Sequence, residues 1–345
     1  MPISMLKNTL PKRKVIHCIA FLFLFPVITA AQNTYLTDVE DFLIDMLLIS
    51  NKYVSPAAEA AVYQSTGSWY SSAKSLELYK VDVSLHVNAL SVSDAQKSFT
   101  VNDSDFIGLD IRDAESAQVP TALGGDTSVF YDFTLGSDDY ELQTFEGAKQ
   151  QVFYYPYLQG SIGLWGQTEL TLQYVPEVKI DDSGYKTFGG AIKHNISQYW
   201  LGDNQNPQAL QVAVQVAYSL FDSKVFFDGF EVTSTDQNQD PLAVINSLTV
   251  DANAVTGQFI ASKSVNKFEF VGAFAVSENK FTYTMGGDGD FLIGLLNDAF
   301  TALEDNSFMM RGNIGVNYHL DNWYVASNIT IGKFLNTNFS VHYKL

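Results

Sequence analysis

The feature that most constrains this chain is an alternation of apolar and polar side chains that recurs from about residue 76 to the end. In 210–220 every even-numbered residue is Leu, Val or Tyr, whereas the odd-numbered residues are Gln, Ala or Ser. A period of two indicates β-strands with one apolar face and one small or polar face. The same scheme holds in 308–320 and, with more exceptions, in 81–89, 168–180, 266–276, 322–332 and 338–345.

Short, turn-like connections join these segments, as at Trp165-Gly166-Gln167 and in 319–322. Consecutive strands this close must pair as antiparallel hairpins, because a parallel crossover needs a dozen or more residues. We therefore predict an all-β chain of about 10–14 antiparallel strands. Alternation is poor in 93–150 and 222–246, where Asp, Ser, Gln and Gly abound, so strand boundaries are not predicted there.

The N-terminus has the form of a secretory signal peptide. Four basic residues within 7–14 precede the apolar run 15–30, which ends in the small residues Thr29-Ala30-Ala31. The run contains Pro26 and is shorter than the roughly 20 residues that a transmembrane helix needs, so a membrane anchor is disfavoured. We expect export and cleavage near Ala31, which also removes Cys18 and excludes disulfides and thiolate sites from the mature chain.

The charge of the mature chain excludes nucleic acid as a partner. Without the four basic residues of the signal, 16 Lys and Arg face 38 Asp and Glu, a formal net charge of −22. Phosphate binding depends on clustered cations, which this composition does not offer. The content of hydrophobic residues is nevertheless 46 %, so a large apolar surface must face a core or lipid.

The first stretch of the mature chain is predicted to be helical. Residues 37–40 have the form of a capping box, and a second short helix is predicted with Ser55 as its cap, Pro56 at its first position and Gly67 at its end. The first helix carries an apolar stripe that recurs at helical spacing and needs a partner surface. The stripe consists of Leu36, Val39, Leu43 and Met46.

Two placements of this stripe are compatible with the sequence. The helix either folds into a barrel lumen as a plug or lies on the periplasmic side against the barrel mouth. The chain accordingly divides into a signal peptide (1–31), an N-terminal helical segment (32–70) and a β-rich body (71–345).

Period two is shared by soluble sandwiches and membrane barrels, but two features favour a transmembrane β-barrel. The alternating segments are about 10–13 residues long, above the mode of about 5–6 for globular strands and near the 9–11 that cross a bilayer. Aromatic residues bunch at segment ends, where interfacial girdles belong, as in 153–155, 199–200, 226–227 and 323–324. A closed barrel also satisfies every backbone hydrogen bond in hydrocarbon. Outer-membrane lipids are the expected surroundings.

Three stretches carry resemblances to known families. The final strand, with Tyr343 third from the end and Leu345 last, resembles the C-terminal signal of bacterial outer-membrane barrels, which implies recognition by the barrel-assembly machinery. The helical segment followed by Ser55-Pro56-Ala57 and a barrel resembles the FadL-like transporters, which implies a lumen plug and hydrophobic small molecules as cargo. Residues 163–196 also resemble an uncharacterised family of predicted barrels from gliding and marine-type Gram-negative bacteria.

No catalytic, cofactor or metal site is predicted. The acidic loop 236–240 alternates oxygen ligands, but Pro241 stands where a calcium loop needs glycine. Gly286-Gly287-Asp288-Gly289-Asp290 is a single copy of a repeat that binds calcium only when stacked. No histidine has a partner at metal-ligand spacing, and the motifs of serine hydrolases and phosphate loops are absent, so an enzyme is not predicted.

Three functions remain from the sequence. The first is an outer-membrane channel or transporter for hydrophobic small molecules, with the N-terminal helices as gate. The second is a non-transporting barrel that acts in adhesion or envelope assembly through the acidic stretches 235–246 and 286–307. The third is a soluble secreted β-sandwich that binds a ligand. The first predicts a polar lumen lined by Gln211, Gln215, Arg311, Asn313, Asn317, His319 and His342.

Overall fold

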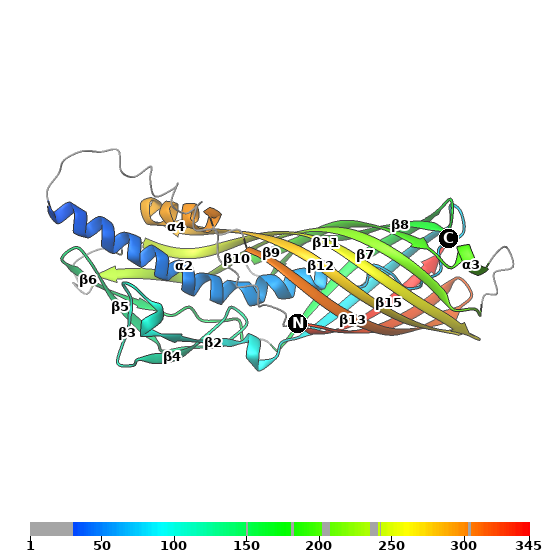
Figure 1. The fold of residues 1–345 in the computed structure, drawn as a ribbon, viewed down its shortest axis with the longest axis horizontal. Coiled ribbons are helices and arrows are strands. Elements are labelled where there is room, and N and C mark those ends of the chain that lie inside the picture. Colours follow the sequence, from blue (N-terminus) through cyan, green and yellow to red (C-terminus); the bar gives the residue numbers. More distant parts are fainter. Residues whose placement is uncertain are drawn as a thin grey trace, which may run out of the picture.

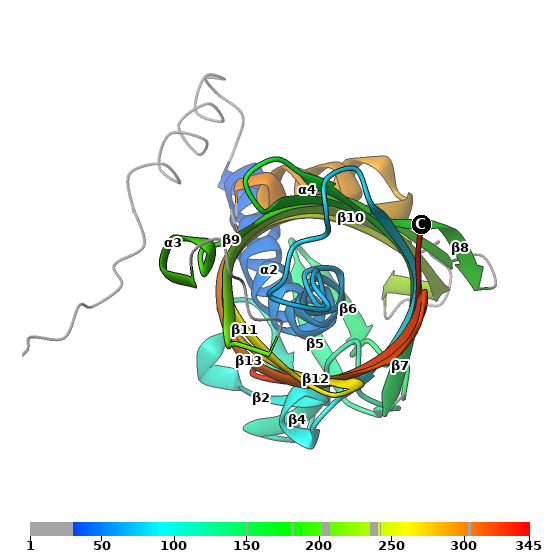
Figure 2. The same cartoon turned by 90° about the vertical axis from the view of Figure 1, so that its right-hand side faces the viewer.

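The centre of the molecule is a closed barrel of ten antiparallel strands, seen from the side in Figure 1 and along its axis in Figure 2. The computed structural model describes residues 30–149, 151–180, 183–201, 208–234, 241, 243–302 and 305–345. The predicted antiparallel barrel with an N-terminal helix is confirmed, and the β-sandwich alternative is excluded. The strands are β1 (Val81–Ser91), β7 (Val152–Leu164), β8 (Thr168–Ile180), β9 (Ser183–Asn195), β10 (Gln211–Ser234), β11 (Ala243–Val265), β12 (Phe268–Asp288), β13 (Asp305–Leu320), β14 (Trp323–Ile331) and β15 (Leu335–Lys344).

Neighbouring barrel strands are also neighbours in the chain, except at two places. From β7 to β15 each strand pairs with the next as a hairpin, as the short connections predict. The ring closes where β1 pairs with β15 over ten residue pairs, and β1 pairs on its other side with β7. Between β1 and β7 the chain makes an excursion of about 60 residues outside the barrel.

This excursion forms a cap over one mouth of the barrel (Figure 1). We use the word cap for residues 92–149 together with the parts of α2 (Ala30–Ser65), α4 (Asp290–Ala302) and β10–β12 that pack against them. The excursion consists of η2 (Asp94–Gln96), β2 (Ser98–Asn102), η3 (Asp103–Asp105), β3 (Asp110–Ile111), β4 (Ser116–Pro120), β5 (Phe130–Leu135) and β6 (Asp138–Gln143). At the opposite mouth, tight turns join most strands, and a short helix, α3 (Gln198–Leu201), follows β9.

An apolar band surrounds the barrel. Large apolar side chains point outward from all ten strands, among them Leu85, Leu172, Val216, Phe270 and Ile314. Each strand crosses the band in about ten residues, which at about 3.3 Å per residue and a tilt of about 40° span about 25 Å, the height of a lipid-facing band. Exposed aromatic residues border the band at the tight-turn mouth (Tyr79, Trp165, Tyr199, Trp200, Trp323) and towards the cap (Tyr154, Tyr174, Phe188, Tyr218, Phe308).

The polarity of the wall inverts where β10, β11 and β12 continue beyond the band into the cap. Along the band part of β12, Phe270 and Phe274 point outward while Glu269 is buried inside. Beyond Asn279 the buried side chains are Phe281, Tyr283 and Met285, and their outward neighbours are Lys280, Thr282 and Thr284. The inward face therefore becomes apolar in the cap, where it packs against α2 and α4.

The N-terminal helix differs from its prediction. The sequence predicts two helices with a break before Pro56, whereas α2 is one helix of 36 residues with Pro56 inside it. Proline removes the hydrogen bond to the carbonyl four residues earlier, but Val54 and Ala58 are buried in the cap core on either side of Pro56. Packing in the cap thus holds the helix continuous.

One of the two acidic stretches is also more ordered than its composition predicts. Helix α4 occupies most of 286–307, and its Leu292, Ile293 and Leu296 are buried in the cap core. The acidic loop 236–240 lies outside the described residues. Among the described residues, no helix is both long and apolar enough to cross a membrane.

Candidate functional site

The candidate site is the barrel lumen, which the N-terminal segment fills. Figure 2 shows the end of α2 inside the ring of strands. After α2 the chain continues through the lumen as an extended segment, residues 66–76, which we call the strap, and it reaches β1 at the tight-turn mouth. The C-terminal end of the helix and the strap together occupy the space that the ten strands enclose.

Side chains of the lumen hold the strap by its backbone carbonyl groups. Extended backbone without a neighbouring strand leaves its carbonyl groups without partners, and a buried carbonyl needs a donor. Six donors from four strands supply the missing hydrogen bonds. The pairs are Arg311 with Thr66 O, Gln173 Nε2 with Gly67 O (3.5 Å), Gln215 Nε2 with Trp69 O (3.1 Å), Asn317 Nδ2 with Ser71 O (2.7 Å), Lys193 Nζ with Ser72 O (2.9 Å) and Asn195 Nδ2 with Ala73 O (3.0 Å).

Arg311 binds the junction between α2 and the strap. Its guanidinium donates to Thr66 Oγ1 (2.7 Å), to the carbonyl oxygen of Tyr63 in the last turn of α2 and to that of Thr66, the first residue of the strap. The C-terminus of a helix carries a partial negative charge, so a buried cation is favourable there. Among the described residues Arg311 forms no ion pair with a carboxylate, and the helix end takes that role.

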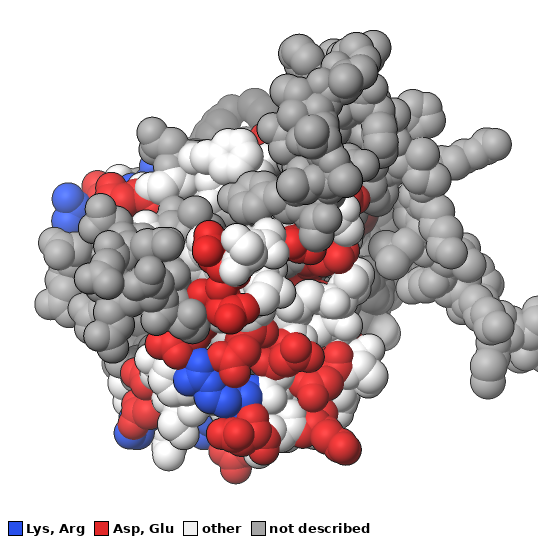
Figure 3. Space-filling view, turned by 90° about the vertical axis from the view of Figure 1, so that its left-hand side faces the viewer, with Lys and Arg blue, Asp and Glu red and all other residues white. Residues whose placement is uncertain are grey.

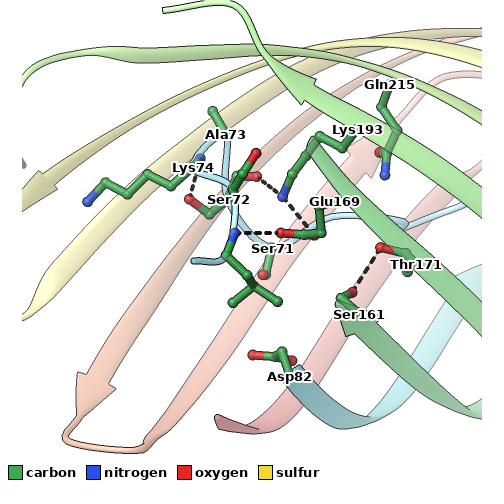
Figure 4. Close-up of polar contacts among 12 residues, drawn as sticks. Ser71, Ser72, Ala73, Lys74, Asp82, Ser161, Glu169, Thr171, Lys193 and Gln215 are labelled. Carbon is green, nitrogen blue, oxygen red and sulfur yellow. Dashed lines mark hydrogen bonds and ion pairs between the residues drawn. The ribbon is translucent and has the colours of Figure 1, made fainter. Parts of the chain in front are cut away.

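A buried ion pair fixes the other end of the strap (Figure 4). Lys193 on β9 and Glu169 on β8 are directly paired across the two strands, and their Nζ and Oε1 atoms lie 2.9 Å apart. Lys193 also donates to Ser72 O, and Glu169 accepts the backbone N–H of Leu76 (3.1 Å). Each charge is therefore satisfied by its partner and by the strap, as a buried pair requires.

A second carboxylate of the wall accepts a hydrogen bond from a serine side chain of the strap. Glu269 on β12 accepts hydrogen bonds from the hydroxyls of Ser72 (2.6 Å) and Ser262 (2.8 Å), and His319 Nε2 lies 3.3 Å from its other oxygen. Ser262 in turn accepts the backbone N–H of Ala73 (3.1 Å). The backbone of Ser72 and Ala73 and the hydroxyl of Ser72 are thus bound by the wall.

Two aromatic side chains of the strap fill the middle of the lumen. Trp69 is fully buried and packs against Ala191 and Ala217. Its ring also lies over Gly189, where an added Cβ would come within 2.6 Å of the ring. Tyr70 packs against a small apolar patch, and its hydroxyl accepts a hydrogen bond from Asn313 Nδ2 (2.7 Å). Small wall residues therefore give these two rings their space.

The seven residues predicted to line a lumen all belong to the inward faces of their strands. Gln215, Arg311, Asn313 and Asn317 contact the helix end or the strap, as described above. The remaining three contact other wall residues. Gln211 accepts from Asn195, His319 approaches Glu269, and His342 Nδ1 lies 2.9 Å from Asp82 Oδ1.

The residues predicted as a plug helix lie in the cap. Val39 and Met46 are buried in the cap core and Leu43 packs against it, whereas the Leu36 side chain lies outside the described residues. Asp45 on the same helix accepts the backbone N–H groups of Ile107, Gly108 and Leu109 at 2.7–3.0 Å. The cap therefore holds the first half of α2, and the lumen holds its end.

Tyr53 forms another connection between α2 and the cap. Its hydroxyl donates to the carbonyl oxygen of Glu146 (2.6 Å), and its ring packs against Phe145. Burial, together with the nearby Glu146 carboxylate, raises the pKa of Tyr53 to about 12, because both disfavour the phenolate.

Sequence reasoning missed the charged residues that hold the strap, namely Glu169, Lys193 and Glu269. Each stands at an inward position of an alternating segment: in 168–174, for example, Leu170, Leu172 and Tyr174 alternate with Glu169, Thr171 and Gln173. A charge on the polar face of a predicted barrel strand is the signal that would have found them.

A polar cavity of about 720 Å³ opens at the tight-turn mouth, between the strap and the wall. We call it the mouth cavity. Its lining includes four lysines and four acidic residues, together with serines, asparagines and two tyrosines. The charged members are Lys74, Lys80, Lys193 and Lys344, and Glu77, Asp82, Glu169 and Glu269. Among the residues that the structure describes, no group of three or more His, Cys, Asp or Glu has the arrangement to hold a metal ion.

These features define a ten-stranded barrel with an apolar exterior, a cap at one mouth and a lumen filled by its own N-terminal segment. The chain belongs to a family of unknown function, DUF6588, whose model matches residues 11–345. A comparison with curated protein sequences finds no match.

Solved structures with a similar fold are outer-membrane barrels. The translocator domain of the autotransporter NalP from Neisseria meningitidis is 7 % identical, with 87 % of this chain and 97 % of that chain covered and a TM-score of 0.31. The outer-membrane protease OmpT from Escherichia coli is 9 % identical, with coverages of 79 % and 100 % and a TM-score of 0.28. The outer-membrane protein OpdK from Pseudomonas aeruginosa is 9 % identical, with coverages of 78 % and 99 % and a TM-score of 0.19. At these scores the likenesses carry no argument about activity.

Proposed function

We propose that this protein is a bacterial outer-membrane channel whose lumen is closed by the end of α2 and the strap. The apolar band with its two aromatic borders supports insertion into a bilayer. Barrels of this kind have short turns on the periplasmic side and longer segments outside the cell, and this pattern supports a cap outside the cell. Insertion would use the barrel-assembly machinery, with β15 as the recognised strand.

The observation that carries the proposal is the way in which the strap is bound. It is held by side chains of the wall and takes no part in the β-ladders, so it can detach from the wall and shift within the lumen without breaking the hydrogen bonds that close the barrel. The wall beside it also has polar atoms without protein partners, including both amide atoms of Gln258, Thr256 Oγ1 and Asn279 Oδ1. Buried polar groups of this kind are normally hydrated, as expected along a solute path.

The cargo that this lumen favours is polar. The mouth cavity and the inward faces of the strands are lined by charged, amide and hydroxyl groups. A hydrophobic compound would have to desolvate them without replacing their hydrogen bonds, which is unfavourable. We therefore propose small polar solutes in place of the hydrophobic compounds that the resemblance to FadL-like transporters implies.

A disulfide between strap and wall tests the closure directly. The Oγ atoms of Ser72 and Ser262 lie 3.4 Å apart, and the predicted mature chain contains no cysteine, so the double variant Ser72→Cys/Ser262→Cys provides a single, well-placed bond. We expect the oxidised variant to show no channel openings in planar bilayers and the reduced variant to open at least as often as the wild type, because the hydroxyl contacts to Glu269 are lost. The single variant Ser72→Cys is the matched control.

Removal of the plug is the complementary experiment. A variant that lacks residues 32–76 should give large, permanently open conductance and faster liposome swelling than the wild type. The proposal fails if this variant is folded, as judged by heat-modifiable gel migration, and conducts no better than the oxidised double-cysteine variant.

A second candidate function is adhesion or envelope assembly through the cap. Residues 92–149 contain twelve Asp and Glu but three Lys and Arg, a formal net charge of −9, and Figure 3 shows acidic side chains across this end of the molecule. A cationic partner would be attracted to this face. Capture of a specific partner by the wild type, and its loss when cap carboxylates are converted to amides, would favour this function.

A further inference from the structure

We propose that the mouth cavity binds a small dipolar solute, one with an ammonium group and a carboxylate, such as an amino acid or a short peptide. The inference rests on the proposed channel function and names its substrate class. It is drawn from two sets of groups in the cavity. The deep set consists of acceptor oxygens without a hydrogen-bond donor, and the peripheral set consists of lysines without a carboxylate.

The deep groups are two acceptor oxygens. Asp82 is 5 % exposed, His342 binds its Oδ1 and the Tyr324 hydroxyl lies near its carboxylate, but its Oδ2 makes no hydrogen bond of 3.5 Å or less among the described residues. Asn317 is fully buried, and its Oδ1 is likewise without a partner. In Figure 4 the Asp82 carboxylate lies on the wall below the strap. A ligand that satisfies both oxygens must donate hydrogen bonds.

The orientation of the Asn317 amide follows from its neighbours. Its Nδ2 lies 2.7 Å from the carbonyl oxygen of Ser71 and 3.5 Å from a carboxylate oxygen of Glu269. Both neighbours are acceptors, so the nitrogen must face them and the oxygen must face away. Asn317 therefore offers an acceptor, like Asp82, and an ammonium group with three donors suits this pair.

The peripheral groups are two lysines. Lys80 and Lys344 line the same cavity, and neither forms an ion pair within the described part of the chain. Lys344 lies over the ring of Tyr324, 4.8 Å from its centroid, and Lys80 is exposed. They differ in this from Lys193, whose charge Glu169 neutralises, and they are free to bind a carboxylate.

The balance of charge in the cavity narrows the class of solute further. Its four lysines and four acidic residues leave no formal net charge among these side chains, so a simple cation or a simple anion gains little from the cavity as a whole. A solute with both charges gains at both places, with its ammonium group against Asp82 and Asn317 and its carboxylate near Lys80 and Lys344. This arrangement would bring the solute to the strap at Ser71, before any opening.

Equilibrium binding to the purified, folded full-length protein in detergent tests the proposal. Glycylglycine is the probe in isothermal titration calorimetry, with ethylammonium and acetate as probes of the two halves. We expect glycylglycine to bind more tightly than either half. Asp82→Asn should weaken binding by about tenfold or more because it removes a charge-assisted hydrogen bond. The double variant Lys80→Gln/Lys344→Gln should weaken the binding of glycylglycine but leave the binding of ethylammonium unchanged.

Asp321→Asn is the matched control, since Asp321 is an exposed aspartate in the turn at the same mouth and should bind like the wild type. The proposal is overturned if wild-type protein does not bind glycylglycine, or if Asp82→Asn, folded by heat-modifiable migration, binds it as well as the wild type. Planar-bilayer recordings of the wild type separate this result from the channel proposal. Binding of glycylglycine by a wild type that never opens would overturn the channel proposal alone, whereas openings without binding would overturn only the proposal for the mouth cavity.

Discussion

The two parts of β10, β11 and β12 form a direct comparison within one set of strands. Inside the band their outward side chains are apolar and their inward side chains are mostly small or polar, whereas in the cap the inward side chains are mostly apolar and the outward ones, apart from Val225 and Phe226, mostly polar. Backbone geometry and period are the same in both parts. With the proposed insertion into a bilayer, the difference teaches that the surroundings of the outer face decide which face of a strand is apolar, and that the inner face follows from what it packs against.

The largest expected effect is the loss of an apolar side chain from the cap interior. Phe42 on α2 is buried and stacks on Phe133 with 4.5 Å between the ring centroids. Phe42→Ala should lower the free energy of cap unfolding by about 3–5 kcal/mol, because it leaves a cavity in a packed core. Ile44→Ala, at an exposed site of the same helix, is the control and should cost much less. Urea unfolding in lipid vesicles measures both.

The second-largest effect is expected from a charge placed on the outer face of β12, because its cost should differ between the band and the cap. Phe274→Lys, within the band, should cost about 2–4 kcal/mol if lipid surrounds this position, whereas Thr282→Lys on the same strand in the cap should cost close to nothing. The same unfolding measurement applies. Equal costs at the two positions would contradict the inversion of the surroundings.

A smaller effect is expected at the junction between α2 and the strap. Arg311→Met keeps the length of the side chain but removes the cation from the end of α2. The free energy needed to open the strap should then fall by up to about 2 kcal/mol, because the helix end loses its countercharge. Hydrogen exchange of residues 66–76 reports this opening, and Arg311→Lys should retain part of the protection.

The smallest effect is the ionisation of Tyr53. Its pKa is raised to about 12 in the folded protein, whereas an unfolded tyrosine ionises near its ordinary value of 10. The contribution of the neutral phenol to cap stability is therefore complete below pH 10 and is lost as the pH rises towards about 12. The difference in phenolate absorbance between the wild type and Tyr53→Phe should show one group that titrates near 12. A midpoint near 10 would show that the residue is not buried in the cap.

The barrel could be predicted from the sequence because alternation is a local signal, but the length of three strands could not. In β10 the apolar phase runs through Val216, Tyr218 and Leu220 and then passes to Phe221, which is buried on the opposite face. This change of phase resembles the end of a strand, although the strand continues to Ser234. For the same reason 222–246 has poor alternation in the sequence.

The strap was beyond sequence reasoning for a different reason. Its partners Lys193, Asn195, Gln215 and Arg311 are more than 100 residues away in the chain, and each looks like an ordinary polar wall residue. A predicted barrel fixes which side chains point inward. It does not determine which of them meets a given carbonyl of a segment without periodicity.

The path of the strap also has a consequence for assembly. The N-terminal segment enters the ring at the cap and leaves it at the opposite mouth, where it continues directly into β1, one of the two strands of the closing seam. Since Asp45 ties the helix to the cap at one side and β1 fixes the chain at the other, the segment cannot be drawn in after the ring is complete. We therefore expect β1 and β15 to pair last, around a segment that the other strands already surround.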